Sequence, residues 1–222
     1  AGATTVAFVP EKGWFWFIPQ HNNITSVGIV AEARYLTRDG VKKPEDIFKR
    51  EITENKWIRQ YLSEGEPVGP YRATSEYTFR SRYSSEKGLL LIGDAFGFLD
   101  PVFSSGLLIA LKSGVLAGET VSQCLKDDDL SPGRFTEYSR VMCEGIENMR
   151  KLVYAFYNEK FSFKDLIDKY PEVGGDVTDC LSGDVNKDFS VLWEKIRDFA
   201  EIPEELPYGM PLTKQQTDIS PA

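Results

Sequence analysis

The residues best suited to chemistry lie in one stretch, from Leu89 to Gly118. An apolar run, Leu89–Ile92, predicts a strand that is buried on both faces. A Gly-Asp pair and a connection rich in Gly and Pro follow, and the apolar spacing is helical from Leu107 to about Leu125. A strand, turn and helix in this order present backbone N–H groups to an electron-rich ligand at the positive end of a helix dipole. Asp94, directly after the strand, suits hydrogen bonds from ribose or ribityl hydroxyl groups. The alternative is a strand, loop and helix that serve stability alone.

A second group of candidates lies near the start of the chain. Trp14, Trp16 and Ile18 share one face of a predicted strand because side chains alternate with a period of two, and Pro19 follows them. This aromatic face either lines a ligand site or packs on a core. His21 is the only histidine and lies in a polar turn with two Asn residues, which tolerate positive φ. It is either a general base or a solvated loop residue.

The segment GDAFGFLDPVFSSG, residues 93–106, resembles the second flavin-binding motif of FAD-dependent monooxygenases of the p-hydroxybenzoate hydroxylase type. Its DPVFSSG portion is most similar to flavin-dependent halogenases, and WFWFIP, residues 14–19, also resembles a signature of that family. The resemblance implies FAD as cofactor, a hydroxyl of its sugar-alcohol chain on Asp94, and halide at the backbone amides of Ser105 and Gly106. The cofactor-binding residues that it implies are Gly93, Asp94, Gly97, Asp100, Pro101, Gly106 and Leu107. The residues that it implies as site lining are Trp14, Trp16, Pro19 and Phe103, and no metal is implied.

The resemblance also implies a reaction and its partners. Reduced FAD, O2 and halide act on an electron-rich aromatic small molecule, and a flavin reductase supplies the reduced flavin. Halogenases specific for tryptophan carry Glu where this chain has Phe103, so a phenol or a pyrrole, free or bound to a carrier protein, is the expected substrate. The alternatives are an FAD-dependent aromatic monooxygenase, a flavoprotein similar to geranylgeranyl reductase, and a non-catalytic fragment that binds no flavin alone. Arg80 or Arg82 either contacts a flavin phosphate or lies on an exposed strand face.

The expected fold is α/β, an α+β fragment that forms the C-terminal part of an FAD/NAD(P)-binding flavoprotein monooxygenase. Residues 1–82 are expected in an antiparallel substrate-domain sheet, with strands at Thr4–Val9, Trp14–Ile18, Thr25–Ala31 and Glu76–Arg82. Residues 83–126 are expected to hold the last Rossmann strand and the FAD-binding helix, and residues 201–222 an irregular tail. Further helices are predicted at Lys43–Asn55, continued by Trp57–Leu62, then at Ser131–Asn158, Phe163–Tyr170, Gly175–Leu181 and Phe189–Ala200, the last four in a helical region over residues 127–200. We expect the G-x-G-x-x-G turn and the family's essential lysine outside these 222 residues.

Composition narrows the class of protein further. The chain is 41% hydrophobic and 27% charged, as in soluble globular proteins. Its net charge of −8 argues against nucleic acid and against anionic membrane surfaces as partners. Three cysteines without metal-ligand spacing predict buried free thiols in a reducing compartment, so a cytoplasmic protein is expected.

Overall fold

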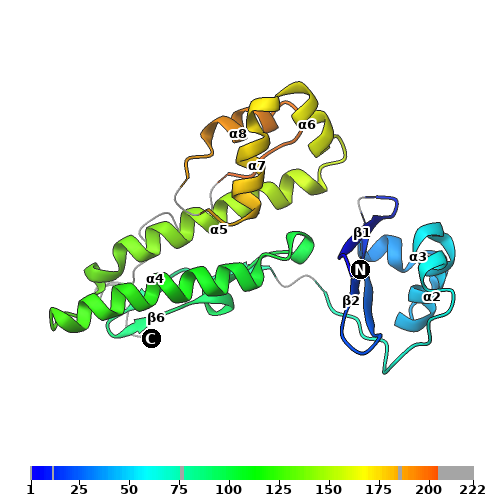
Figure 1. Ribbon diagram of the computed structural model, residues 1–222, viewed down its shortest axis with the longest axis horizontal. Helices are drawn as coiled ribbons and strands as arrows, with labels where there is room; N and C mark the ends of the chain where they lie inside the picture. The colour runs from blue at the N-terminus through cyan, green and yellow to red at the C-terminus, as the bar shows by residue number, and fades with distance from the viewer. Residues whose placement is uncertain (1, 12, 76–77, 185–186, 205–222) are drawn as a thin grey trace. The chain divides into compact units, whose positions relative to one another are not determined.

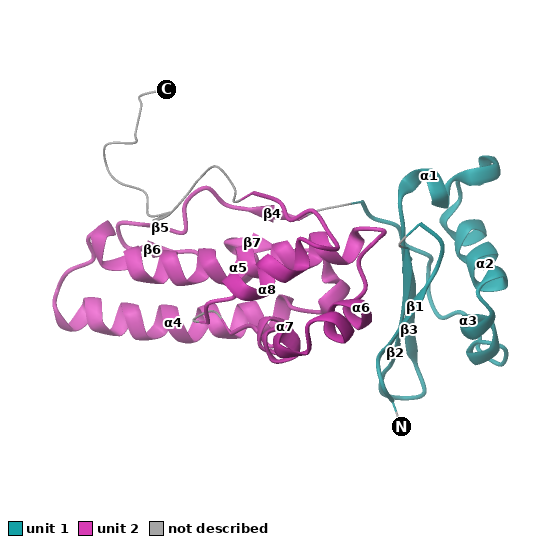
Figure 2. Ribbon diagram, turned by 90° about the horizontal axis from the view of Figure 1, so that it is seen from above, with its two compact units in different colours: residues 1–75 teal, residues 76–222 magenta. Residues whose placement is uncertain are grey.

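The computed structural model describes residues 2–11, 13–75, 78–184 and 187–204. It divides the chain into two compact units, residues 1–75 and 76–222 (Figure 2). The sequence predicts a sheet domain that extends to residue 82, whereas Phe79 and Arg80 belong to the second unit. Within the described residues, no helix combines the length and the apolar character that crossing a membrane requires.

The first unit contains a three-stranded antiparallel sheet in the order β1-β2-β3. Its strands are β1 (Thr5–Phe8), β2 (Trp14–Pro19) and β3 (Thr25–Val30), which confirms the first three predicted strands. The turn between β2 and β3 places Asn22 and Asn23 at φ 57°, the left-handed conformation that Asn tolerates. The sheet therefore forms from the period of two and from turn residues that fit their backbone.

Helices cover one face of this sheet (Figure 2). They are α1 (Ala33–Leu36), the 3-10 turn η1 (Arg38–Gly40), α2 (Pro44–Glu54) and α3 (Lys56–Tyr61). Phe15 is fully buried with its ring 6.3 Å from that of Phe48, and the Phe17 ring meets Trp57 edge-on at 5.3 Å. The predicted continuation of the helix through residue 62 is interrupted, because the backbone of Asn55 is extended. The Asn55 side chain accepts a hydrogen bond from the Ile58 amide and so caps a new helix.

The strands of the second unit are shorter than predicted. β4 (Phe79–Arg80) pairs with β7 (Gly97–Phe98), and β5 (Ser85–Glu86) pairs with β6 (Leu89–Leu90), each antiparallel. Glu76 and Tyr77 lie outside the described residues, and the rest of Glu76–Arg82 does not join the first sheet. Leu89–Ile92 was expected to be buried on both faces, but its first two residues form a hairpin strand, with Leu89 52% and Ile92 45% exposed.

Two long helices form the body of the second unit (Figure 1). α4 (Gly106–Lys126) has 21 residues and α5 (Thr136–Tyr157) has 22, which confirms both predicted helices. α5 starts later than predicted: Pro132–Phe135 form a 3-10 turn, η4, and the Ser131 side chain makes no capping bond. The remaining helical elements are α6 (Phe163–Lys169), η5 (Pro171–Val173), α7 (Gly174–Leu181) and α8 (Ser190–Ile196). The three short helices predicted for the last third are thus confirmed.

Ala110, Gly114 and Gly118 recur every four residues along α4 and form a stripe of small residues, a spacing that predicts close packing against a neighbouring element. Ala110 contacts the turn at Gly93, but a Cβ atom at Gly114 or Gly118 would meet nothing within 4 Å. On the same helix, Leu107, Leu111 and Val115 are exposed by more than 60% each. Close approach therefore explains only the first position of the stripe.

The opposite side of α4 packs against α5 in one of two buried apolar clusters. The first cluster contains Phe96, Leu99, Ile109, Ala117, Tyr138, Met142, Cys143, Ile146 and Met149. The second joins the end of α5 to α6, α7 and α8. All three cysteines are free and buried, as predicted, and burial raises the pKa of the Cys180 thiol to about 12.

Tyr138 links α5 to the apolar run before the Gly-Asp turn. Its hydroxyl donates a hydrogen bond to the carbonyl oxygen of Leu91 at 2.6 Å, and the side chain is 3% exposed. Burial raises the pKa of Tyr138 to about 12 from its ordinary value of 10. The folded chain therefore requires the neutral phenol.

This shift predicts a pH dependence of stability. The contribution of neutral Tyr138 is complete below the pKa of the unfolded chain, roughly 10, and is lost as pH rises from about 10 to about 12. We expect the free energy of unfolding to fall by about 2–3 kcal/mol more across this window in the wild type than in Tyr138→Phe. Urea unfolding at several alkaline pH values measures both curves. Parallel curves would contradict the assignment.

Candidate functional site

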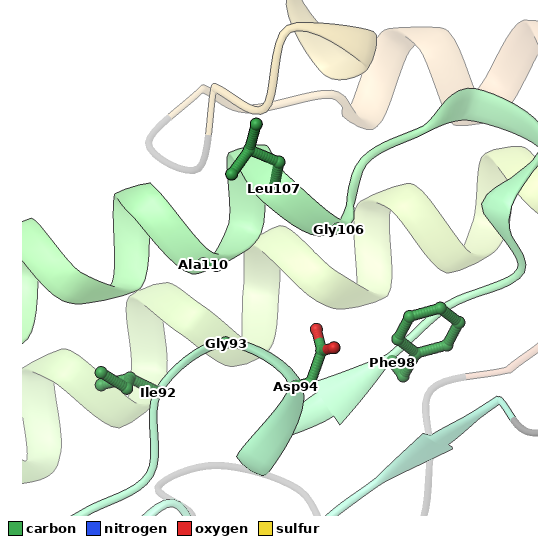
Figure 3. Close-up of a pocket in the computed structure, with 7 residues that line it drawn as sticks. All are labelled: Ile92, Gly93, Asp94, Phe98, Gly106, Leu107 and Ala110. Carbon is green, nitrogen blue, oxygen red and sulfur yellow. The ribbon is translucent and has the colours of Figure 1, made fainter. Parts of the chain in front are cut away.

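A hollow of about 480 Å³ lies where the Gly-Asp turn meets the start of α4 (Figure 3). Its lining comes from three short segments of the second unit. They contribute Ile92, Gly93 and Asp94; Phe98; and Gly106, Leu107 and Ala110. Four predicted residues, Gly93, Asp94, Gly106 and Leu107, are thus brought together around one space, and the Asp94 carboxylate is exposed.

Gly93 holds the turn against α4 by close approach and by a buried hydrogen bond. Its φ is +51°, and a Cβ atom there would lie 3.2 Å from that of Ala110, so glycine is required. The Gly93 amide donates to Ser113 Oγ at 2.8 Å, and the same hydroxyl donates to the Ala110 carbonyl at 3.0 Å. Ser113 is fully buried and was missed in the sequence. Its signal was a single hydroxyl among apolar residues two turns into α4.

The connection from Asp100 to α4 exposes a set of backbone donors. Asp100 Oδ1 accepts from the Val102 amide at 3.0 Å, which starts the 3-10 turn η3 (Pro101–Phe103). Ser104 then adopts a left-handed conformation at φ 53° and redirects the chain into the helix. The first α-helical bond runs from the Ile109 amide to the Ser105 carbonyl at 2.9 Å, so the amides of the first turn precede the hydrogen-bond ladder. Such amides can bind an anion or an electron-rich oxygen.

Three other predicted cofactor residues make contacts within the chain and do not line the hollow. Gly97 pairs with Arg80, and a Cβ atom there would lie 3.2 Å from the Phe79 carbonyl oxygen. Asp100 Oδ2 accepts a hydrogen bond from the Tyr157 hydroxyl at 3.0 Å. Pro101, the third, opens η3 and is exposed. These contacts shape the loop beside the hollow, and direct cofactor contact by these residues stays a prediction.

Phe103, predicted as site lining, and Ser105, predicted as halide donor, are not among the residues that line the hollow. The Phe103 ring is 5.6 Å from that of Phe156 and 6.1 Å from that of Phe163, both in edge-on geometry. Ser105 is buried and immediately precedes α4, and its side chain makes no capping bond. Its backbone is therefore at the helix terminus, as the halide prediction requires.

The aromatic candidates of β2 belong to the first unit. Trp14 and Trp16 lie on one face of the strand, with ring centroids 6.2 Å apart, and Pro19 ends it. The Trp16 indole lies over Gly28 of β3, where a Cβ atom would be 2.0 Å from the ring, and its Nε1 donates to Ser26 Oγ at 3.1 Å. The rings are thus fixed by the neighbouring strand, while their role as site lining stays a prediction. His21 is exposed in the turn after β2.

Arg80 does not lie on an exposed strand face, which corrects that expectation, and it is not among the residues that line the hollow. Its side chain is 3% exposed, and its Nη1 contacts Glu147 Oε1 and Cys143 Sγ, both at 2.8 Å. The second oxygen of Glu147 pairs with Arg150 at 2.7 Å. A buried guanidinium needs such compensation, so Arg80 serves to attach β4 to α5.

The hollow fits the binding of FAD on three observations. Gly93 leaves no room for a side chain, the exposed Asp94 carboxylate can accept hydrogen bonds from a sugar-alcohol chain, and the first amides of α4 precede the first α-helical hydrogen bond, which Ile109 donates. FAD is a redox cofactor whose chemistry the protein directs by position and electrostatics. Among the described parts of the chain, no three His, Cys, Asp or Glu side chains are grouped so as to hold a metal ion.

The chain is similar to several known proteins. A family model described as tryptophan halogenase matches residues 2–165. A 1H-pyrrole-2-carbonyl-[peptidyl-carrier protein] chlorinase of Pseudomonas fluorescens is 30% identical over 205 residues, 91% of this chain and 45% of the relative. A 1H-pyrrole-2-carbonyl-[peptidyl-carrier protein] brominase of Pseudoalteromonas luteoviolacea is 29% identical over 127 residues, 57% of this chain and 31% of the relative. The solved structure of flavin-dependent brominase Bmp2 aligns with a TM-score of 0.74 at 24% identity, covering 89% of this chain and 49% of that one.

The family model and the relatives define the class of the chain as part of an FAD-dependent oxidoreductase. Within that class, the chain belongs to the tryptophan halogenase family, which comprises flavin-dependent halogenases. The chain spans less than half of the length of each of the three proteins compared above.

Removal of the Ser113 hydroxyl tests how the Gly-Asp turn is held. In Ser113→Ala the buried Gly93 amide loses its acceptor, so we expect the free energy of unfolding to fall by about 1–3 kcal/mol. Urea unfolding provides the measurement. Ser122→Ala, an exposed position on the same helix, is the matched control and should remain within about 0.5 kcal/mol of wild type. Equal stability of the two variants would show that the bond contributes nothing.

Proposed function

We propose that the complete protein is a flavin-dependent halogenase that uses reduced FAD, O2 and halide on an electron-rich aromatic substrate. The observation that carries this proposal is the N-terminus of α4. Its first-turn amides precede the helical ladder and lie beside a hollow that also contains the Asp94 carboxylate. One end of a single helix thus offers donors for an anion next to a place for a flavin.

Each residue has a defined task in this proposal. Asp94 accepts a hydrogen bond from the sugar-alcohol chain and holds the cofactor in register with α4. The amides of Ser105 and Gly106 bind halide, which needs only neutral donors because it is weakly hydrated. A flavin reductase supplies the reduced FAD. Reduced FAD activates O2, which is the oxidant for halide. Trp14, Trp16 and Pro19 line the route to the aromatic substrate.

The substrate that we propose is a phenol or a pyrrole. Phe103 occupies the position where tryptophan-specific halogenases carry Glu, and it packs against two aromatic rings of the helical region. The names of the pyrrole-2-carbonyl chlorinase and brominase support a substrate bound to a carrier protein. We therefore favour a carrier-bound pyrrole first and a free phenol second.

Incorporation of halogen is the decisive test. We expect the complete enzyme, given a flavin reductase, O2 and chloride or bromide, to yield products with the isotope pattern of halogen in mass spectrometry. In Ser105→Pro one halide donor is lost at a φ of −77° that proline tolerates, so the halide concentration for half-maximal rate should rise roughly tenfold.

Ser105→Ala is the matched control for that variant, because it removes the hydroxyl and keeps the amide. Its halide requirement should equal that of wild type, and both variants should retain bound FAD. Products that contain only added oxygen, with halide in excess, would assign the protein to the aromatic monooxygenases instead.

A separate prediction concerns the cofactor. Asp94→Ala should weaken the binding of FAD to the complete protein by about 1.5–3 kcal/mol, the worth of a hydrogen bond to a charged group. Fluorescence titration with FAD measures the dissociation constant. Asp46→Ala, which removes an exposed carboxylate from α2, is the control and should bind FAD as the wild type does. An unchanged FAD dissociation constant in Asp94→Ala would show that Asp94 does not contribute to binding FAD.

A further inference from the structure

The loop that leads into α4 has little structure of its own. Two short-range hydrogen bonds organise it: the Val102 amide to Asp100 Oδ1 at 3.0 Å, and the Ser104 amide to the Pro101 carbonyl at 2.8 Å. Ser104 is in a left-handed conformation, which is unfavourable for a residue other than glycine. The geometry of this loop therefore depends on contacts from elsewhere in the fold.

Such contacts come from the last turn of α5. The Tyr157 hydroxyl donates to Asp100 Oδ2 at 3.0 Å, so one oxygen of the carboxylate is held by α5 while the other caps the loop. The neighbouring Phe156 is buried, and its ring packs edge-on against Phe103 at 5.6 Å. Two consecutive residues of α5 thus hold the start and the middle of the loop.

We propose that Tyr157 is a positioning residue for the anion-binding terminus of α4. Tyr157 holds Oδ2 of Asp100 while Oδ1 accepts from the Val102 amide, and it thereby sets the direction in which η3 leaves and the orientation of the amides at Ser105 and Gly106. This inference deepens the proposed function and rests on it for the identity of the anion as halide. The positioning itself is a property of the loop and can be measured without flavin.

The first experiment is hydrogen exchange by mass spectrometry on the 222-residue chain. In Tyr157→Phe we expect the amides of residues 102–106 to exchange roughly 3- to 10-fold faster than in wild type, because one anchor of Asp100 is lost. Tyr154→Phe makes the same change one turn earlier, at a half-exposed position, and should leave these amides unchanged. Equal exchange in the two variants would overturn the proposal. Faster exchange along the whole of α4 and α5 would also overturn it, since it would indicate a loss of general stability.

A double-mutant comparison tests whether Tyr157 acts through Asp100. Asp100→Asn keeps an oxygen for the Val102 amide and weakens the partner of the Tyr157 hydroxyl. If both residues act through one bond, the double variant should exchange no faster at residues 102–106 than the faster single variant. If the increases in exchange rate of the two single variants multiply in the double variant, Tyr157 does not act through Asp100.

The second experiment uses the complete enzyme. We expect Tyr157→Phe to raise the halide concentration for half-maximal rate at least threefold and to lower the yield of halogenated product per O2 consumed, with the FAD dissociation constant changed less than twofold. A halide requirement equal to that of Tyr154→Phe would overturn the positioning of the halide site. If the wild type incorporates no halogen, the proposed function fails, and the exchange experiment alone decides whether Tyr157 positions the loop.

Discussion

One buried hydrogen bond, from the Gly93 amide to the Ser113 hydroxyl, sets the distance between the Gly-Asp turn and α4. Together with the close approach of Gly93 to Ala110, this bond fixes the Gly-Asp turn to the first two turns of α4. The first amides of α4 precede its α-helical hydrogen bonds. α4 is in turn held by its buried side against α5. A carboxylate and a row of amide donors therefore share one rigid support, which is the condition for binding a cofactor and an anion at a constant separation.

The elements that could be predicted are those with a long regular pattern. α4 and α5 each have about 20 residues of helical apolar spacing, and the first three strands alternate between turns that fit. Short elements depend on neighbours that a pattern does not identify. Leu89–Ile92 is apolar enough for a central strand, yet β6 pairs only with β5 among the described strands, so Leu89 remains half-exposed. Trp57–Leu62 has helical spacing too, but Asn55 interrupts the helix before it.

The candidate site divides in the same way. Gly93, Asp94 and the start of α4 were found because their chemistry depends on local backbone geometry, which the order of glycine, acid and helix reveals. Asp100 and Arg80 carry charged side chains that suit a ligand, but their contacts are with distant parts of the chain. Ser113 and Tyr157 were missed for the converse reason. The isolated hydroxyl of Ser113 does not identify the Gly93 amide, 20 residues away, as its partner, and Tyr157 lies 57 residues from Asp100.

The bond between Asp100 and Tyr157 has a consequence for how the chain folds. Its partners are 57 residues apart, and the intervening segment contains both long helices. Closing so long a segment costs chain entropy that local contacts must offset first, so α4 and α5 pair before the loop is held. We therefore expect the loop beside the candidate site to be among the last parts to reach its native geometry, at a rate set by closure of the helical hairpin.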